Sequence, residues 1–319
     1  SALSNSTVAL LLIPVALSVS NDEVLKTRFL LSVAFGASIS GITTPIGTPP
    51  NLIFIGFLET VGFEGIGFMT WIMMMLPLTI AMLYAMVKIL SFGLPNDTLQ
   101  IEVFKEISVS FAHKRLLVML GCLLLLLLLN SPIKPIYNGL GLNENAVLLL
   151  FGLLMFVPKL GFLQWEDSKQ IPYEINFLFG AGFCVAMAIS EMSLGSAFAP
   201  IFSYLSSLPI LVFILLLCLL VLTLSMFISS TALIAILLSI IFASTKGFLD
   251  PQMQSLVMLI ATICVGFSFM FPISTPPNAI VFSKGGIKIW DMFRFGICLS
   301  GVGIVLLIAF AMLYWRWFL

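Results

Sequence analysis

The sequence predicts an all-α, polytopic membrane protein with inverted repeats, re-entrant helical hairpins and two broken transmembrane helices. Of its 319 residues, 61% are hydrophobic and 9% are charged, whereas about a quarter of the residues of soluble domains are charged. Several apolar runs approach the roughly 20 residues with which a helix spans a bilayer, and none alternates like a strand. A proline-rich motif also occurs twice, in GITTPIGTPPNLIF at 41–54 and in FPISTPPNAIVF at 271–282.

Turn and breaker residues such as Asn21-Asp22, Gly93-Leu94-Pro95 and Asp250-Pro251 divide the chain into segments. The apolar run that follows Ser6 is too short to span a bilayer, so we expect a half-length helix there. In chain order, the expected elements are a helix at 6–20, a long helix broken at 44–50, a helix at 68–92, a polar stretch at 93–115, helices at 116–130, 145–158 and 173–190, two helices at 209–228 and 231–244 that meet near 229, a helix at 254–284 broken at 272–277, and a final span at 290–315.

Charge orients these elements. If the second pair of helices, meeting near 229, enters and leaves from one side as a re-entrant hairpin, 11 of the 14 basic residues lie on the other side. They are Lys26, Arg28, Lys88, Lys105, Lys114, Arg115, Lys159, Lys169, Lys284, Lys288 and Arg294. The positive-inside rule makes this side cytoplasmic and the C-terminus external.

We expect each proline motif to break its helix and to leave backbone groups that can bind ions. Tandem prolines remove backbone donors and free carbonyls in the preceding turn, and such carbonyls are good cation ligands. Thr48 and Thr275 each suit the N-cap of a new half-helix that has proline at its first position, with a positive dipole end and unpaired amides that attract anions. The alternative is that each motif is only a kink, whose free backbone groups are hydrogen-bonded by neighbouring helices.

A second pair of motifs precedes the first at a matching distance. Ser4-Asn5-Ser6 begins 44 residues before Thr48, and Ser229-Ser230-Thr231 begins 46 residues before Thr275. This spacing indicates an internal repeat of hairpin tip plus broken helix. Small hydroxyl and amide side chains can coordinate sodium and bind anionic oxygens without carrying charge into the membrane.

Composition argues against several other functions. All 14 acidic residues fall in expected loops or at helix ends, so a buried carboxylate proton relay has no candidate, and neutral oxygen ligands fit sodium better. The single histidine, His113, supplies neither a nucleophile–base pair nor a metal cluster, so we expect no enzyme. No basic stripe suggests nucleic acid. A channel with re-entrant loops stays an alternative, although an inverted repeat suits alternating access better.

These motifs resemble those of the divalent anion/sodium symporters, a family that carries dicarboxylates, tricarboxylates or sulfate. The family has a Ser-Asn-Thr triplet at each of two hairpin tips and a Gly-Ser/Thr-Pro-Pro-Asn type loop in each broken helix. The resemblance implies a first sodium site made by Ser4, Asn5 and a carbonyl near Gly47, and a second made by Ser225, Ser229, Ser230 and a carbonyl near Ser274. The anion would face Ser6, Thr48, Thr231 and Thr275.

Two departures from the family pattern carry consequences. Ser230 stands where the family has asparagine, which implies a changed second sodium site, an altered stoichiometry or a sodium-independent exchanger. The family also has several helices before the first triplet, so we expect that this chain begins partway through a larger protein.

The resemblance also implies an organisation and partners. The function implied is sodium-coupled uptake of a divalent anion by an elevator-type mechanism in the plasma (inner) membrane, with Na⁺ as coupling ion, no organic cofactor and a homodimer at full length. The expected parts are 1–66 (latter arm of the first hairpin and first broken helix, transport domain), 67–207 (connecting and scaffold helices with a cytoplasmic segment at 93–115), 208–289 (second hairpin and second broken helix, transport domain) and 290–319 (final transmembrane helix).

Overall fold

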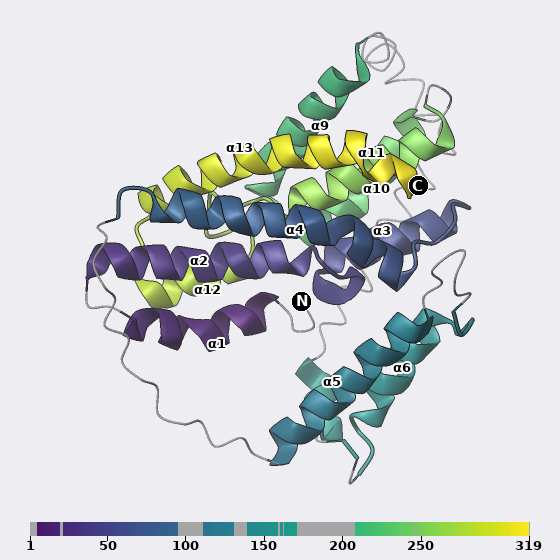
Figure 1. The fold of residues 1–319 in the computed structure, drawn as a ribbon, viewed down its shortest axis with the longest axis horizontal. Helices are drawn as coiled ribbons and strands as arrows, with labels where there is room; N and C mark the ends of the chain where they lie inside the picture. The colour runs from purple at the N-terminus through teal and green to yellow at the C-terminus, as the bar shows by residue number, and fades with distance from the viewer. Residues whose placement is uncertain are drawn as a thin grey trace.

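The described part of the chain is helical throughout, apart from its turns and connections (Figure 1). The structure is a computed structural model that describes residues 5–19, 22–94, 111–130, 139–158, 160–161, 163–170, 208–245, 247 and 249–318. The α-helices are α1 (Asn5–Ser18), α2 (Glu23–Gly41), α3 (Pro49–Thr60), α4 (Phe68–Ser91), α5 (Phe111–Asn130), α6 (Glu144–Leu154), α9 (Ile210–Ser225), α10 (Ser230–Thr245), α11 (Pro251–Val265), α12 (Pro276–Gly285) and α13 (Ile289–Leu313). The predicted helix at 173–190 and Ser4 lie outside the described residues.

The all-α prediction is confirmed, and most expected elements occur with shifted ends. The helix predicted at 116–130 begins earlier, at Phe111, because basic residues at a membrane boundary continue a helix that hydropathy alone does not mark. The helix predicted at 145–158 ends at Leu154, because Pro158 disfavours helical backbone at the residue before it. Both breaks also begin earlier than predicted, at 42 and at 266.

Six helices around the two breaks form two units with the same element order. The first unit is α1, α2 and α3, and the second is α10, α11 and α12. The short helix after each break packs against the other unit: α12 contacts α1 and α2, whereas α3 contacts α10 and α11. In Figure 1, α1 and α12 extend from the centre to the left, and α3 and α10 extend from the centre to the right. The two units are therefore interlocked.

The two long helices α4 and α13 pack on each other and on this core. Both are long and apolar enough to cross a membrane. Pro77 lies inside α4 and removes the donor that would bond the carbonyl of Met73. Tyr314 takes that place, because its hydroxyl donates to the Met73 carbonyl at 3.1 Å, and the Trp315 indole donates to the Met74 carbonyl at 2.8 Å. Residues that directly follow α13 thus provide hydrogen bonds to two carbonyls of α4 that precede Pro77.

The second break rests directly on α13. A Cβ on Gly296 would lie 2.6 Å from the Phe269 carbonyl oxygen, so only glycine lets α13 approach the unwound segment so closely. Ser300 donates to the Phe267 carbonyl at 2.6 Å. Small residues at a membrane helix interface allow such close packing, so α13 fixes the position of the loop that precedes α12.

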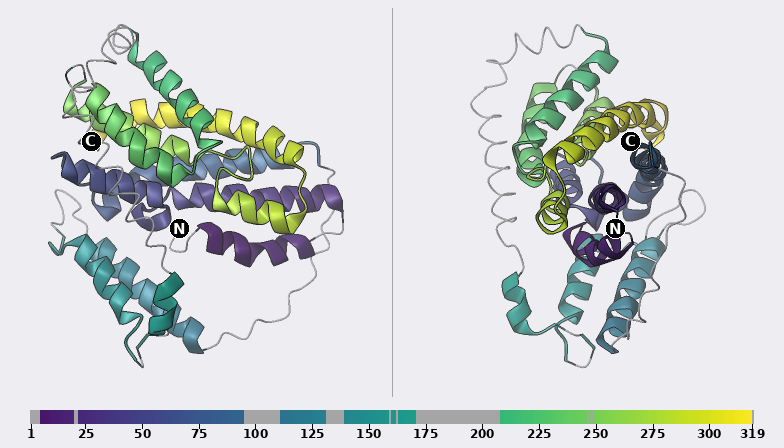
Figure 2. Two further views of the ribbon diagram at one scale, coloured as in Figure 1. Left: turned by 180° about the vertical axis from the view of Figure 1, so that it is seen from behind. Right: turned by 90° about the vertical axis from the view of Figure 1, so that its left-hand side faces the viewer.

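Helices α5 and α6 stand apart from this bundle (Figures 1 and 2). They form a separate small core built from Leu123, Leu127 and Val147, which also includes Phe68 of α4. Asn130 joins the two helices, because its amide donates to the Leu142 carbonyl and accepts from the Leu142 N–H, both at 2.8 Å. Among the described elements, their principal link to the bundle is α4.

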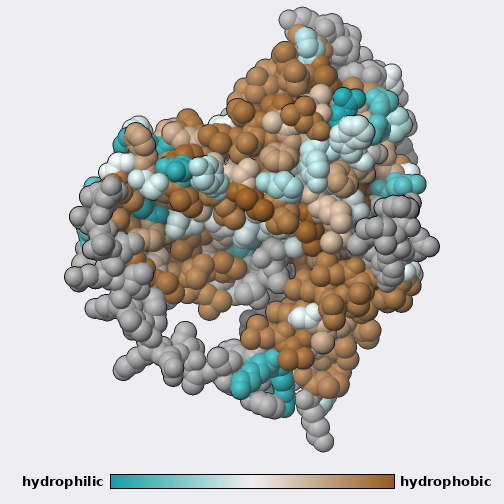
Figure 3. All heavy atoms as spheres, in the orientation of Figure 1, coloured by the Kyte–Doolittle hydropathy of each residue, from teal (hydrophilic) through white to brown (hydrophobic). Residues whose placement is uncertain are grey.

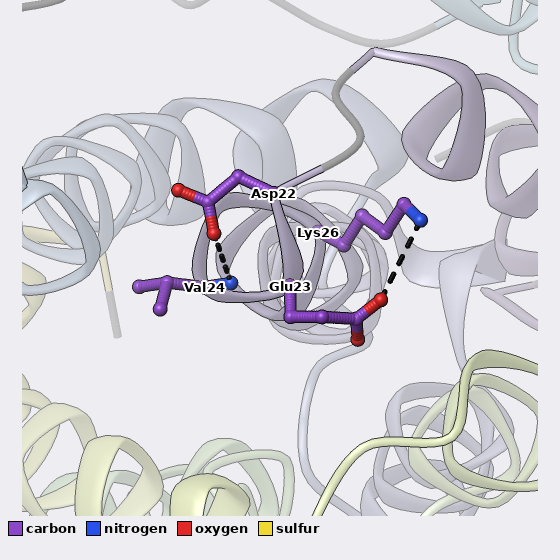
Figure 4. Close-up of polar contacts among 4 residues, drawn as sticks. All are labelled: Asp22, Glu23, Val24 and Lys26. Atoms are coloured by element: carbon purple, nitrogen blue, oxygen red, sulfur yellow. Dashed lines mark hydrogen bonds and ion pairs between the residues drawn. The ribbon is translucent and has the colours of Figure 1, made fainter.

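Charged residues gather at one end of the bundle. Helix α2 is capped by Asp22, whose carboxylate accepts a hydrogen bond from the Val24 N–H at 2.8 Å. The Lys26 Nζ lies 3.6 Å from the Glu23 Oε1 (Figure 4). Arg28 follows, and its guanidinium lies 3.8 Å from the centre of the Phe295 ring of α13. On the face shown in Figure 3, the surface between the two ends of the bundle is predominantly apolar, which suits a lipid environment.

Candidate functional site

The two breaks have the same internal architecture. Pro45 and Pro272 lack an N–H, so each leaves the carbonyl four residues earlier, of Gly41 and of Ser268, without a helical donor. An asparagine six residues after each proline replaces that donor. The Asn51 amide donates to Gly41 O at 3.2 Å and to Thr44 O at 3.0 Å.

Asn278 repeats these bonds in the second unit. Its amide donates to Ser268 O and to Phe271 O, both at 3.1 Å, at the same sequence offsets of 10 and 7 residues. Both asparagines are buried. Each of these four carbonyls thus has a side-chain donor, and the carbonyls near Gly47 and Ser274, which are expected from the sequence to bind sodium, are not among them.

Thr48 and Thr275 are the N-caps of α3 and α12, as predicted. Their backbones are almost identical, with φ −140° and ψ 147° for Thr48 and φ −140° and ψ 148° for Thr275. Neither hydroxyl makes a capping bond, because prolines at the first two helical positions offer no N–H to accept. Each hydroxyl is thus left for another partner.

The prediction of unpaired amides at these helix starts needs correction in the first unit. Pro49 and Pro50 have no N–H, and the Asn51 N–H is bonded to the Thr48 carbonyl at 3.2 Å. Attraction of an anion to this helix start therefore depends on the helix dipole and on hydroxyl groups.

The first residues of α1 and α10 approach the breaks closely. A Cβ on Gly41 would lie 2.6 Å from the Asn5 side-chain amide and 2.5 Å from the methyl carbon of Thr48, so glycine at 41 makes room for both. A Cβ on Gly47 would overlap the Gly41 carbonyl. In the second unit, the Ser230 hydroxyl donates to the Val265 carbonyl at 3.3 Å.

One cavity of about 210 Å³ connects all four segments. Its lining comprises Asn5, Ser6, Ser38, Ile42, Gly47, Thr48, Pro49, Pro50, Asn51, Ser229, Ser230, Thr231, Thr262, Ile263, Val265, Gly266, Ser274, Thr275, Pro276 and Pro277. Nine of the eleven residues predicted for the site are in this list. Of the others, Ser225 is fully buried outside the lining, and Ser4 lies outside the described residues.

The electrostatics of the cavity come from backbone ends. None of the described lining residues is charged. Four helices, α1, α3, α10 and α12, begin at residues that line the cavity or adjoin its lining, and each N-terminus carries roughly half a positive charge. Helices α2 and α11 end beside it with their negative C-termini. The arrangement can therefore hold an anion and, next to it, cations.

Three buried oxygen atoms at the second break have no hydrogen-bond partner within the described residues: Ser274 Oγ, Thr275 Oγ1 and Asn278 Oδ1. Leaving a buried polar group unpaired costs about 1–3 kcal/mol. Unpaired buried oxygens next to a cavity are typical of a ligand site rather than of a kink with only a structural role.

The sequence interpretation did not include several residues of this site. No role is predicted from the sequence for Asn51 and Asn278, which lie within the two motifs. Their repeated position six residues after a proline is the signal that could have identified them. Ser38 and Thr262 line the cavity from α2 and α11, and Ser268 lies behind it. These serine and threonine hydroxyls lack a sequence signature, because serine and threonine also bond back to their own helix.

Interlocked broken helices around a cavity that is lined by uncharged residues, among them serine and threonine, are an arrangement typical of membrane transporters. The model of the CitMHS family, described as citrate transporters, matches residues 1–266. The chain belongs to this family, within the divalent anion/sodium symporters.

Characterised relatives agree with this assignment. The chain is 28% identical to a sodium-dependent low-affinity dicarboxylate transporter of Caenorhabditis elegans, over 93% of this chain and 56% of the relative. It is 25% identical to the sodium-dependent dicarboxylate transporter SdcS of Staphylococcus saprophyticus (96% and 64%), and 28% identical to the Na⁺/dicarboxylate cotransporter 3 of Rattus norvegicus (90% and 56%). The chain spans a little over half the length of these relatives.

Proposed function

We propose that the protein carries out sodium-coupled uptake of a small divalent anion, a dicarboxylate such as succinate, or citrate or sulfate. The observation that carries the proposal is the convergence of four helix N-termini on a cavity whose described lining has no charged side chain. A volume of about 210 Å³ is below the roughly 300–1,000 Å³ of sites for drug-sized ligands, so the substrate is small. Bound sodium ions would supply the positive charge that side chains do not.

The anion in this proposal is bound by hydroxyl groups. Ser6, Thr48, Thr231 and Thr275 line the cavity from the two hairpin tips and the two helix starts. A hydroxyl donates a single hydrogen bond and carries no charge. Such a site can release its substrate when sodium leaves, because most of the positive charge then leaves as well.

Sodium in this proposal is bound at the two breaks. Ser4, Asn5 and the Gly47 carbonyl form the first site, and Ser225, Ser229, Ser230 and the Ser274 carbonyl form the second. The support is that Asn5 lies against Gly41 at the negative end of α2, and that Ser230 lies against Val265 at the negative end of α11. Unwound carbonyls and helix C-termini are the usual ligands of coupling cations in transporters.

An elevator mechanism needs a moving body that contains the whole cavity. We propose that this body comprises the two interlocked units, the predicted transport parts 1–66 and 208–289, and that α4 and α13 move with it because both pack on it. Scaffold elements would then lie within the rest of the 67–207 part, where α5 and α6 stand apart. A cytoplasmic basic end, an external C-terminus and a homodimer at full length belong to the same proposal.

Proteoliposomes that contain the full-length protein test the function. We expect saturable uptake of labelled succinate, citrate or sulfate that an inward sodium gradient drives and that choline does not support. Exchange without sodium would favour the exchanger alternative. Large single-channel currents would favour a channel.

A further inference from the structure

Ser268 occupies the position in the second unit that Gly41 occupies in the first. The equivalence follows from the asparagine bonds, because Asn51 donates to Gly41 O and Asn278 donates to Ser268 O at the same offset of 10 residues. Ser274 is likewise equivalent to Gly47, because each lies four residues before the asparagine of its unit. Each unit has one hairpin-tip residue beside this position, Asn5 in the first and Ser230 in the second.

The larger side chain lies at the start of the first helix in the first unit, whereas in the second unit the additional side chains lie at the break. In the first, the long Asn5 side chain faces Gly41, and a Cβ at 41 would lie only 2.6 Å from its amide. In the second, the short Ser230 faces a segment that has side chains at both 268 and 274. An asparagine at 230 would therefore meet the Cβ of Ser268, if it occupied the position that Asn5 has.

The oxygen atoms are redistributed in the same way. Ser268 donates to the Val265 carbonyl at 2.8 Å, and Ser230 donates to the same carbonyl at 3.3 Å. Ser268 is also placed to donate to the hydroxyl of Ser225, so its single hydrogen serves either Ser225 or the Val265 carbonyl, and Ser225 donates to the Leu222 carbonyl at 2.8 Å. A hydroxyl has one hydrogen and two lone pairs, so Ser225 and Ser268 keep lone pairs after these donations.

Ser268 and Ser225 are both fully buried, and the buried Ser274 Oγ has no hydrogen-bond partner among the described residues. We infer that Ser268 supplies an oxygen ligand to the second sodium site and so sets its sodium affinity, where the hydroxyls of Ser225, Ser268 and Ser274 replace the amide that is present in the first. The inference rests on the proposed sodium coupling. It accounts for the serine at 230: the missing amide oxygen is supplied from the break rather than from the hairpin tip.

Four variants of the full-length protein test this inference in proteoliposomes. Ser268→Ala removes the hydroxyl and keeps the Cβ, Ser230→Asn adds the amide against that Cβ, and Ser230→Asn/Ser268→Gly recreates the pairing of the first unit. Ser255→Ala is the matched control, because Ser255 lies on α11 and donates to a carbonyl three residues earlier, as Ser268 does.

The readouts are the sodium concentration for half-maximal uptake of the transported anion and the rise in melting temperature that sodium produces without substrate. We expect Ser268→Ala and Ser230→Asn each to raise that concentration roughly fivefold and to weaken the stabilisation by sodium, whereas the double variant restores both and Ser255→Ala changes neither.

Normal sodium dependence in Ser268→Ala, or a double variant worse than both single variants, would overturn the inference and leave the sodium coupling intact. Uptake by the unmodified protein that ignores sodium would instead remove the proposed function and this inference together.

Discussion

Thr48 and Thr275 show how a local backbone choice directs a side chain to a ligand. Each stands before two prolines that have no N–H to donate to its hydroxyl oxygen, and the hydroxyl makes no capping bond and lies beside the cavity. A buried hydroxyl without a partner, as in Thr275, is tolerated where a ligand completes its bonding.

Replacing either threonine by valine keeps the shape and removes the hydroxyl. We expect Thr48→Val and Thr275→Val each to raise the anion concentration for half-maximal uptake roughly tenfold, because a hydrogen bond to a charged group is worth about 1.5–3 kcal/mol. Uptake measured against anion concentration at saturating sodium checks this. Thr223→Val is the control, since Thr223 is exposed and bonds only to the Leu219 carbonyl. An unchanged anion dependence in both variants would exclude these hydroxyls from the site.

The composition of the site was largely predictable, because short polar residues are unusual within such apolar segments. The role of Asn51 and Asn278 was not. An asparagine directly after two prolines gives no indication of which carbonyls it reaches, since that depends on how the unwound segment folds back. Ser268 was hidden for a similar reason, because its importance appears only when the two breaks are compared atom by atom.

At the scale of the element, Pro45 and Pro272 each remove the hydrogen-bond donor for the carbonyl four residues earlier. The predicted break at 272–277 begins at 266 in the structure, where Gly266 caps α11 and its N–H donates to the Ile263 carbonyl at 3.0 Å. Pro272 removes the donor for Ser268 farther along the unwound segment. Apolar runs in the sequence located the long helices α4 and α13 within a few residues, whereas the prolines marked each break but not the residue at which the preceding helix ends. The asparagine amide then holds the unwound segment to the helix it left.

The side-chain amides of Asn51 and Asn278 should be required as hydrogen-bond donors to the carbonyls at the breaks. We expect Asn51→Asp and Asn278→Asp to lower the melting temperature and abolish sodium-dependent uptake, because a carboxylate cannot donate to the two carbonyls and would face them with its charge. Thermal unfolding in detergent and uptake in liposomes give the two measurements. Asn143→Asp is the control, because Asn143 caps α6 by accepting a bond from Ala146, which aspartate can also do. Wild-type stability in both variants would contradict the proposed bonding role.

At the scale of the whole molecule, the two units are related by an apparent reversal of direction. The connection into α2 and the connection into α11 lie at opposite ends of the bundle in Figure 1, and the first of these ends is rich in basic residues. In a membrane, such a charge bias sets the cytoplasmic side.

Cysteine labelling tests this orientation. In a background without the native cysteines, Glu23→Cys and Gln252→Cys place one thiol in the first turn of α2 and one in the first turn of α11, both exposed. A membrane-impermeant maleimide should label Gln252→Cys in intact cells, and Glu23→Cys only after the membrane is opened. Labelling of both positions from one side would rule out oppositely directed units.

The exchange of short helices between the units has a consequence for biosynthesis. Helix α3 packs against α10 and α11, which the ribosome makes some 170 residues later. Until then α3 lacks these partners, and the first break lacks the contacts that the second unit provides. Assembly of the binding cavity is therefore a late event that follows synthesis of the second unit, however early the first unit enters the membrane.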